Sequence, residues 1–323
     1  MGKPEILCLG EALIDMVPPE LGTSIIERGE LRIAAGGAPA NVAVGLARLG
    51  SPVGFIGKVG ADFFGQHLKN LLAKNGVDVT FLLSEKRANT CLAFVTWNER
   101  NDAEYLFYRN PSADTLLEPS DIDSEYLTNA KVLQFGSLLL ATEPSASATY
   151  HALELASKAG VLLSYDINLR LSVWADEATA RKAVVQPLAY ANIVKLNRAE
   201  LTFITGETDL EAGCKKLWRE QFKLVIVTLD KDGCYYQTKT AQGYVPAFVA
   251  EVVDTVGTGD GFLAGMLDQL WRGNFNFEDA KLIEKACRQA AAVGSIVVGR
   301  SGGIPAMPTR QEVDQYLESH PAK

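Results

Sequence analysis

The chain of 323 residues has few of the features that mark secreted or membrane proteins. Its five cysteines are odd in number and scattered without a C-x-x-C pair, which argues against a disulfide framework and against a zinc site. No apolar run approaches the ~18 residues of a membrane-spanning helix, and the N-terminus reaches a strand-like run without the apolar core of a signal peptide. We therefore expect reduced, buried thiols and a cytoplasmic location.

Positive charge is also scarce. The net charge is −8 and lysine and arginine form no cluster, so the electrostatic footprint of a nucleic-acid or anionic-membrane binder is missing. The chain contains only three histidines, in segments that read as helix surface or tail, which argues against histidine-centred catalysis. We expect a small-molecule partner, with no nucleic acid and no membrane.

Apolar, β-branched runs alternate with segments of helical periodicity along most of the chain. Strands that are apolar throughout and separated by helices indicate an α/β fold, a doubly wound, mostly parallel sheet with helices on both faces. Ligands of such folds bind at the carboxyl ends of the strands. The predicted strands are EILCLG, VGFIGKVG, KVLQFGSLLL, VLLSYDIN, NIVKLN and FKLVIVTLD, and helices are predicted over residues 63–74, 146–159, 178–188, 277–298 and 309–318.

One region departs from this alternation. Residues 90–97 and 104–109 read as two alternating strands joined by a polar turn, which predicts an antiparallel hairpin outside the main sheet. Residues 12–33 contain short apolar pieces broken by proline and glycine that can add strands to it. We predict one catalytic domain over residues 1–323 that carries a small β-sheet lid, built from segments of about 12–34 and 88–112.

The stretch DTVGTGDGF places a carboxylate among glycines. VVDTV reads as a strand and GFLAGMLDQLWRG as a helix, so Gly257 and Gly259 are predicted at a strand-to-helix turn. Amides at such a turn form an anion site at the positive end of the helix dipole. Asp260 is then either a helix cap or a reagent, and this motif alone does not decide between them.

Three other nucleotide-binding motifs are excluded. GDGFLA matches the dinucleotide fingerprint in letters, but it lies near the C-terminus and Asp260 would place a carboxylate at the pyrophosphate. The Walker pattern and the protein-kinase motifs are absent from the sequence.

Further polar or glycine-rich segments follow predicted strands, at GGAPANVAVGLARLG, GKVGADFFG, DINLR and NRAE. Each has a structural explanation, but together they predict one polar site at the rim of the sheet.

With these motifs in this order, the chain resembles the ribokinase-like (PfkB) carbohydrate kinases over essentially its full length. Within that family, its sequence is most similar to the fructokinases. The similar segments are GEALIDMVP, GGAPANVA, FYRNPSADTLL and DINLRLSVW. The resemblance implies a ribokinase-like fold and transfer of the γ-phosphate of ATP to a sugar hydroxyl, with fructose giving fructose 6-phosphate. Two alternatives stay open: a kinase of the same family for 2-keto-3-deoxygluconate, ribose or a nucleoside, and a non-catalytic sugar or nucleotide sensor.

In such a kinase Asp260 is the general base, and its place in the first helical turn is expected to hold its pKa low enough for the carboxylate to be ionised. Backbone amides of Gly257, Thr258, Gly259 and Asp260 would form the anion hole. Asp15, expected at the end of the first strand, and Asn41 would bind sugar hydroxyls. The aromatic side chains Phe94 and Phe107 either cover the sugar or form the core of the lid. The other residues expected at the sugar are Gly36 and Gly37 beneath it, Arg109 from the lid above it, and Asn168 and Arg170.

The resemblance places the nucleotide over VTLDKDG and residues 286–294, near Lys195, Thr228, Asp230 and Gly233; Asp230 stands where the family commonly has glycine. Because Asp260 and the triphosphate repel each other, Mg²⁺ is required. The resemblance makes Asn197 and Glu200 its ligands through water. Asp254, carbonyls near Val256 and residues 300–303 resemble a monovalent-cation site for K⁺. The edges of the lid predict a homodimer.

Overall fold

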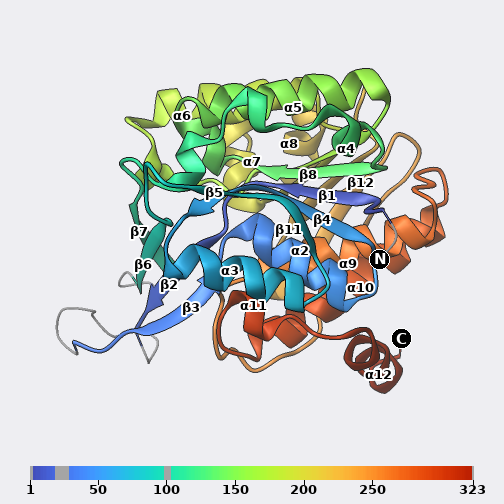
Figure 1. The fold of residues 1–323 in the computed structure, drawn as a ribbon. Helices are drawn as coiled ribbons and strands as arrows, with labels where there is room; N and C mark the ends of the chain where they lie inside the picture. Colours follow the sequence, from blue (N-terminus) through green and yellow to red (C-terminus); the bar gives the residue numbers. More distant parts are fainter. Residues whose placement is uncertain (1–2, 19–28, 98–102, 322–323) are drawn as a thin grey trace.

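The computed structural model describes residues 3–18, 29–97 and 103–321, and within them the strands form two sheets. The large sheet has nine strands in the order β13-β12-β11-β10-β9-β8-β1-β4-β5 (Figure 1). Seven of its strands, β11, β10, β9, β8, β1, β4 and β5 in this spatial order, pair in parallel. The other two, β12 and β13, extend it next to β11 as an antiparallel hairpin. They are β1 (Ile6–Leu9), β4 (Val53–Gly60), β5 (Asp78–Glu85), β8 (Val132–Gly136), β9 (Leu162–Asp166), β10 (Ile193–Asn197), β11 (Leu224–Thr228), β12 (Cys234–Gln237) and β13 (Gln242–Val245).

Helices cover both faces of the large sheet, which confirms the predicted fold class (Figure 1). One face carries α4 (Ser124–Thr128), α5 (Ser145–Ala159), α6 (Glu177–Val185), α7 (Arg198–Thr205) and α8 (Leu210–Leu217). The other carries α2 (Ala38–Arg48), α3 (Phe63–Lys74), α9 (Thr258–Arg272), α10 (Ala280–Val298), α11 (Gly303–Ala306) and α12 (Arg310–Ser319).

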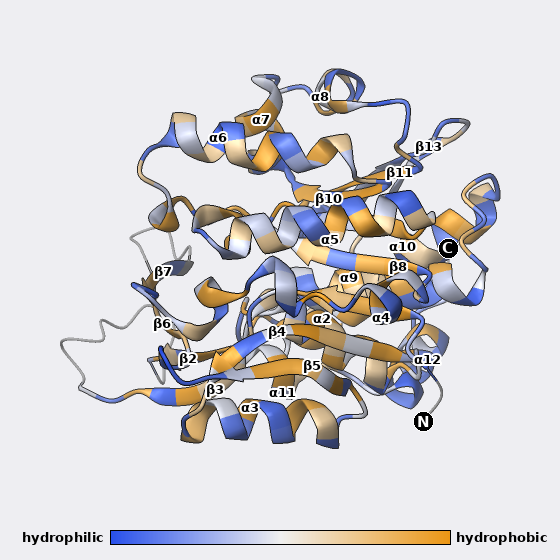
Figure 2. Ribbon diagram, turned by 45° about the horizontal axis from the view of Figure 1, so that its top comes forward, coloured by the Kyte–Doolittle hydropathy of each residue, from blue (hydrophilic) through white to orange (hydrophobic). Residues whose placement is uncertain are grey.

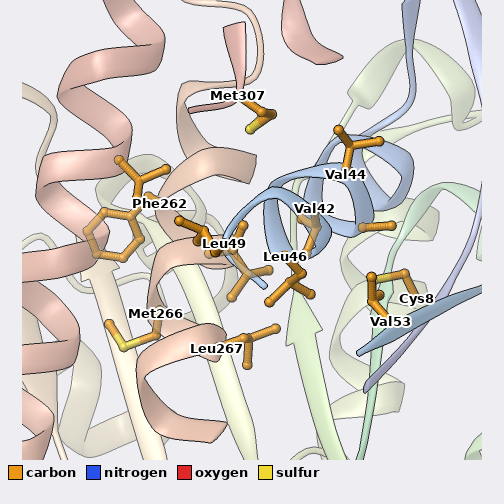
Figure 3. Close-up of a cluster of buried hydrophobic side chains, with 14 of the residues drawn as sticks. Cys8, Val42, Val44, Leu46, Leu49, Val53, Phe262, Met266, Leu267 and Met307 are labelled. Carbon is orange, nitrogen blue, oxygen red and sulfur yellow. The ribbon is translucent and has the colours of Figure 1, made fainter. Parts of the chain in front are cut away.

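Alternation along each strand divides the core between the two faces. In β1, Ile6 and Cys8 pack toward α2 and α9, whereas Leu7 and Leu9 pack toward α5. The strands are therefore apolar on both faces, while outer helices such as α3 and α5 are apolar on one side and polar on the other (Figure 2). The helices α2 and α9 are buried along most of their length. Figure 3 shows the first of these clusters, where α2 meets α9. All five cysteines are free and buried, as expected.

The second sheet is small and has the order β3-β2-β6-β7 among the described residues. It contains β2 (Leu13–Val17), β3 (Arg32–Gly36), β6 (Leu92–Trp97) and β7 (Ala103–Tyr108), with β6 and β7 forming the predicted hairpin. Parts of the predicted segments, residues 19–28 and 98–102, lie outside the described residues. The sheet projects from one end of the large sheet (Figure 1).

Two local predictions were wrong. Asp15 lies in the middle of β2 rather than at the end of the first strand, because the chain leaves the large sheet after Leu9 and enters the small one at Leu13. VVDTV does not form a strand: Val252 and Val253 are exposed, and the amides of Val253 and Asp254 donate to the carbonyl of Val298. A β-branched run needs a partner strand to become one, and this run packs against the end of α10 instead.

No helix in the described part of the chain combines the length and hydrophobicity that a membrane span requires.

A buried charge cluster anchors the C-terminal helix to the core. Asp268 of α9 is fully buried and accepts hydrogen bonds from Ser51 Oγ at 2.9 Å and from Gln289 Nε2 at 2.8 Å. It also pairs with Arg272 and with Arg310 of α12. Removing one partner from a buried ion pair leaves an uncompensated charge, which costs far more than breaking an exposed pair.

We expect Asp268→Asn to lower the free energy of unfolding by about 3–5 kcal/mol, because two arginines lose their buried counter-charge. The matched control is Asp314→Asn, which removes a half-exposed partner of the same Arg310 and should cost less than ~1 kcal/mol. Urea denaturation measures both. Equal losses in the two variants would contradict the anchoring role.

Candidate active site

A cavity of about 940 Å³ opens at the carboxyl ends of β9, β10 and β11, beside the first turns of α2 and α9. It lies where parallel-sheet folds bind ligands. Most of the residues selected from the sequence line it. They are Asp15, Gly37, Asn41, Asn168, Arg170, Lys195, Asn197, Glu200, Thr228, Asp230, Gly233, Val256, Gly257, Thr258, Gly259 and Asp260.

Arg109 does not line this cavity, contrary to its expected role above the sugar. Its guanidinium donates from Nε to Asp114 Oδ2 at 2.9 Å and from Nη1 to the carbonyl of Leu138 at 3.2 Å. Asp114 is itself buried and needs a cation, so Arg109 turns inward to it. Tyr105 and Phe107, on β7, line the cavity in its place.

The helix α9 begins at a turn that glycine makes possible. Gly257 has φ 79°, a left-handed conformation, and a methyl group added to it would stand 2.8 Å from Cα of Gly303. Neither the backbone conformation nor the space suits another residue. Thr258 starts the helix, so Asp260 lies in its first turn together with amides that have no partner within a helix.

Asp260 is held by a second helix. Its Oδ2 accepts a hydrogen bond of 2.7 Å from Nδ2 of Asn41, in the first turn of α2. Burial raises the pKa of Asp260 to about 6, and the charge of Asp166 adds to this effect, whereas Asn41, Lys195 and Arg170 oppose it. With this pKa Asp260 is ionised at neutral pH, as expected, although desolvation outweighs the helix dipole and leaves it a weaker acid than an ordinary carboxyl.

Asp15 faces the cavity from the small sheet. A methyl group at Gly36 would collide with the Asp15 carboxylate, so Gly36 makes room for that carboxylate rather than lining the cavity itself. Burial, together with the charge of Asp260, raises the pKa of Asp15 to about 7. The guanidinium of Arg170 lies 4.7 Å from the ring centre of Tyr105, which joins the small sheet to the large one.

The two aromatic candidates of the hairpin lie on opposite faces of the small sheet. Phe107 lines the cavity, while Phe94 packs against Tyr108 with their ring centres 5.1 Å apart. Phe94 pairs with Leu106 and not with Phe107 in the register of the hairpin, which places it on the opposite face of the small sheet.

Asn197 and Glu200 form the start of α7. Asn197 Oδ1 accepts from the amide of Glu200, and the Glu200 carboxylate accepts from the amides of Asn197 and Leu169 at 2.8 and 2.7 Å. Next to them, Lys195 Nζ lies 3.0 Å from Asp166 Oδ2. The oxygen donors of Asn197 and Glu200 are of the kind that Mg²⁺ accepts, directly or through water.

Asp254 lies behind the cavity wall rather than in it. Its two carboxylate oxygens accept hydrogen bonds from the amides of Val256 and Gly302, each at 2.9 Å. The carboxylate thus joins the segment before α9 to the loop at residues 300–303. Those two bonds occupy one acceptor position on each oxygen and leave the others for a cation.

Asp230, where the family commonly has glycine, has φ 51°. This left-handed conformation explains the glycine, and aspartate is one of the few other residues that tolerate it.

Two residues that line the cavity, Glu11 and Phe248, were not predicted from the sequence. Glu11 Oε1 accepts from the amide of Ala38, and burial raises its pKa to about 8. Its only signal was its place directly after the first strand.

Comparison with known proteins agrees with this geometry. Residues 3–310 match the model of the pfkB family carbohydrate kinases. The chain belongs to this family. It is 42% identical to probable fructokinase-2 of Arabidopsis thaliana over 98% of this chain and 96% of that protein.

Solved structures show the same similarity. Fructokinase from Xylella fastidiosa with bound ATP has a TM-score of 0.88 and 33% identity, over 98% of this chain and 99% of that one. A double mutant of fructokinase from Vibrio cholerae O395, with fructose, ADP and potassium ion bound, has a TM-score of 0.87 and 30% identity, over 98% of both chains.

We expect Gly257→Ala to destabilise the protein by more than about 2 kcal/mol, since the new methyl group meets both backbone strain and Gly303. The matched control is Gly160→Ala, at φ 77° with open space around it, which should cost only about 1 kcal/mol. Chemical denaturation gives both values. A loss at Gly257 no larger than that at Gly160 would contradict the close packing of the turn.

Proposed function

We propose that this protein is an ATP-dependent fructokinase that converts fructose to fructose 6-phosphate. The observation that carries the proposal is the meeting of Asp260 and the first amides of α9 at one wall of a single cavity. Asp15 and Asn41 line the same cavity and supply hydrogen-bonding groups for a polyol. The names and bound ligands of the related structures support fructose as the acceptor and ATP as the donor.

In this mechanism Asp260 takes the proton of the attacking hydroxyl. As the O–H bond breaks, the hydroxyl oxygen forms a bond to the γ-phosphorus, and the electrons of the broken P–O bond stay on ADP. Asn41 holds Oδ2 of the base, which leaves Oδ1 for the acceptor. The amides of Gly259 and Asp260 at the helix start stabilise the charge on the transferring group, whereas the amide of Thr258 donates to the carbonyl of Thr255 at 3.3 Å.

Cations complete the proposal. Asn197 and Glu200 would hold Mg²⁺ through water, and the ion would offset the charge of the triphosphate. Asp254 and backbone carbonyls near Val256 would hold a monovalent cation, a role supported by the potassium ion in the related fructokinase. Nucleotide contacts are assigned to Thr228, Asp230 and Gly233, which line the cavity beyond the end of β11.

The small sheet is proposed to act as a lid. Its inner face supplies Asp15, Tyr105 and Phe107 to the cavity, so movement of the sheet changes both access to the sugar and exclusion of water. The contact of Arg170 with Tyr105 favours the closed position.

Arg170 also supports a second candidate acceptor, a keto acid such as 2-keto-3-deoxygluconate, because its guanidinium lines the cavity and can pair with the carboxylate of the acid.

The direct test is the initial rate with ATP and a panel of fructose, 2-keto-3-deoxygluconate, ribose and a nucleoside. We expect kcat/KM for fructose to exceed the others by at least about tenfold. Asp260→Asn should retain ligand binding and lower kcat by about 10² or more. Asp279→Asn, at the start of α10 and away from the cavity, is the control and should keep full activity. Preferred turnover of another acceptor would overturn fructose, and full activity of Asp260→Asn would overturn the base.

The raised pKa of Asp260 predicts the pH dependence. A carboxyl with a pKa of about 6 is protonated below that value and cannot accept the proton, so kcat/KM should fall as pH decreases through about 6. Asp15→Asn should keep such an acid limb, whereas the residual rate of Asp260→Asn should lack it. A wild-type limb near pH 4 would show that Asp260 has the ordinary acidity of a carboxyl.

We also propose a homodimer that forms through the outer face of the small sheet. A row of apolar residues crosses all four strands in register, from Ile33 through Met16 and Phe94 to Leu106. Ile33, Leu106 and the neighbouring Tyr108 are about 60% exposed, and an exposed apolar face of this kind suits a second copy of itself. A cytoplasmic location stays a prediction from the sequence.

Light scattering tests the dimer. We expect Leu106→Glu to convert a dimeric protein to a monomer, because it places a charge within the apolar row. Tyr244→Glu, equally exposed on β13 at the far edge of the large sheet, should leave the mass unchanged. A monomeric wild-type protein at micromolar concentration would contradict the proposal.

A further inference from the structure

A buried ion pair lies directly behind the first turn of α9. Lys195 of β10 and Asp166 at the end of β9 are opposite each other in the parallel register. Lys195 Nζ lies 3.1 Å from Oδ1 and 3.0 Å from Oδ2 of Asp166. Their side chains are only 9% and 2% exposed, so neither charge is solvated by bulk water.

The two members of the pair differ in their access to the cavity. Lys195 lines it and Asp166 does not. A methyl group placed on Gly259 would stand 3.0 Å from Lys195 Nζ, so the ammonium lies against the start of α9. An ammonium has three donor hydrogens. The two oxygens of Asp166 account for two of them, and the third is left for the cavity at the same wall as the helix amides.

Besides Asp166, Lys195 has two further carboxylates within its electrostatic reach, those of Glu200 and Asp260. Within the described residues Asp260 nevertheless forms no ion pair, because Lys195 is bound to Asp166 instead. A lysine without that partner has a flexible stem and would be drawn to the nearby base, which would compete with proton transfer.

We propose that Asp166 is a positioning residue, which holds the ammonium of Lys195 against the start of α9 so that it contacts the phosphoryl group during transfer, and keeps it from pairing with Asp260. This assignment rests on the proposed kinase function. It makes Lys195 a part of the anion hole rather than a general contact to the nucleotide. Asp166 touches neither substrate, and acts through Lys195.

A purely structural role for the pair gives different expectations. If the ion pair only joins β9 to β10, its removal lowers stability and leaves kcat and KM as they are. The positioning role affects kcat more than KM, since the contact with the transferring phosphoryl group strengthens in the transition state. In either case the acidity of Asp260 changes, because one of its charged neighbours is lost or moved, so the separate effects on kcat and KM decide between the two roles.

The test is a double-mutant cycle in the full-length protein with ATP and whichever sugar the wild type phosphorylates. Asp166→Asn should lower kcat by about ten- to a hundredfold, with KM for ATP within about threefold of wild type. The acid limb of kcat/KM should move to lower pH in Asp166→Asn and to higher pH in Lys195→Met. In the Lys195→Met background, adding Asp166→Asn should cause no further loss of kcat.

Independent, additive losses of kcat, or a KM for ATP that rises as much as kcat falls, would overturn the inference. Both outcomes leave the kinase function standing, whereas a wild type that turns over no sugar with ATP overturns the function itself. If Asp166→Asn does not fold, Asp166→Glu takes its place: it keeps the charge but shifts it by one methylene. We then expect kcat to fall about tenfold with an unmoved acid limb, and full activity would overturn the positioning role.

Discussion

The hydrogen bond from Asn41 to Asp260 joins the first turns of two helices, and the rest of the site depends on it. The helices α2 and α9 lie against each other (Figure 3). Gly45 permits this close packing, because a methyl group there would stand only 2.7 Å from Cβ of Ala264. Their N-termini therefore open into the same cavity. The base is buried by this packing, and two positive helix ends face one ligand space.

Burial has an electrostatic consequence. The cavity has Glu11, Asp15 and Asp260 in its wall, and the pKa of each is raised chiefly by desolvation. Lys195 and Arg170 remain cationic among them. The site therefore combines acids that accept protons near neutral pH with cations that suit phosphate, and bound cations would balance the acids when a triphosphate enters.

Some features were predictable because they follow from local pattern. The apolar runs of β1, β4, β8, β9, β10 and β11 and the periodicity of α3 were identified correctly, as was the polar character of the strand ends. Arg109 was not predictable, since no pattern shows that Asp114 folds back to meet its guanidinium. The run VVDTV failed for a similar reason: strand propensity is high there, but no neighbouring strand is available.

The sequence by itself determined the two-sided parallel sheet, the order of the motifs and the residues that carry chemistry, because hydrophobic periodicity and turn residues act over short stretches of chain. Only the tertiary structure decided which of these residues share the cavity, which face of the small sheet looks inward, and how acidic Asp260 is. Those properties arise from burial and from charges brought together by distant segments, such as Asn41, Asp166 and Lys195 around Asp260, and desolvation has no signature in local sequence.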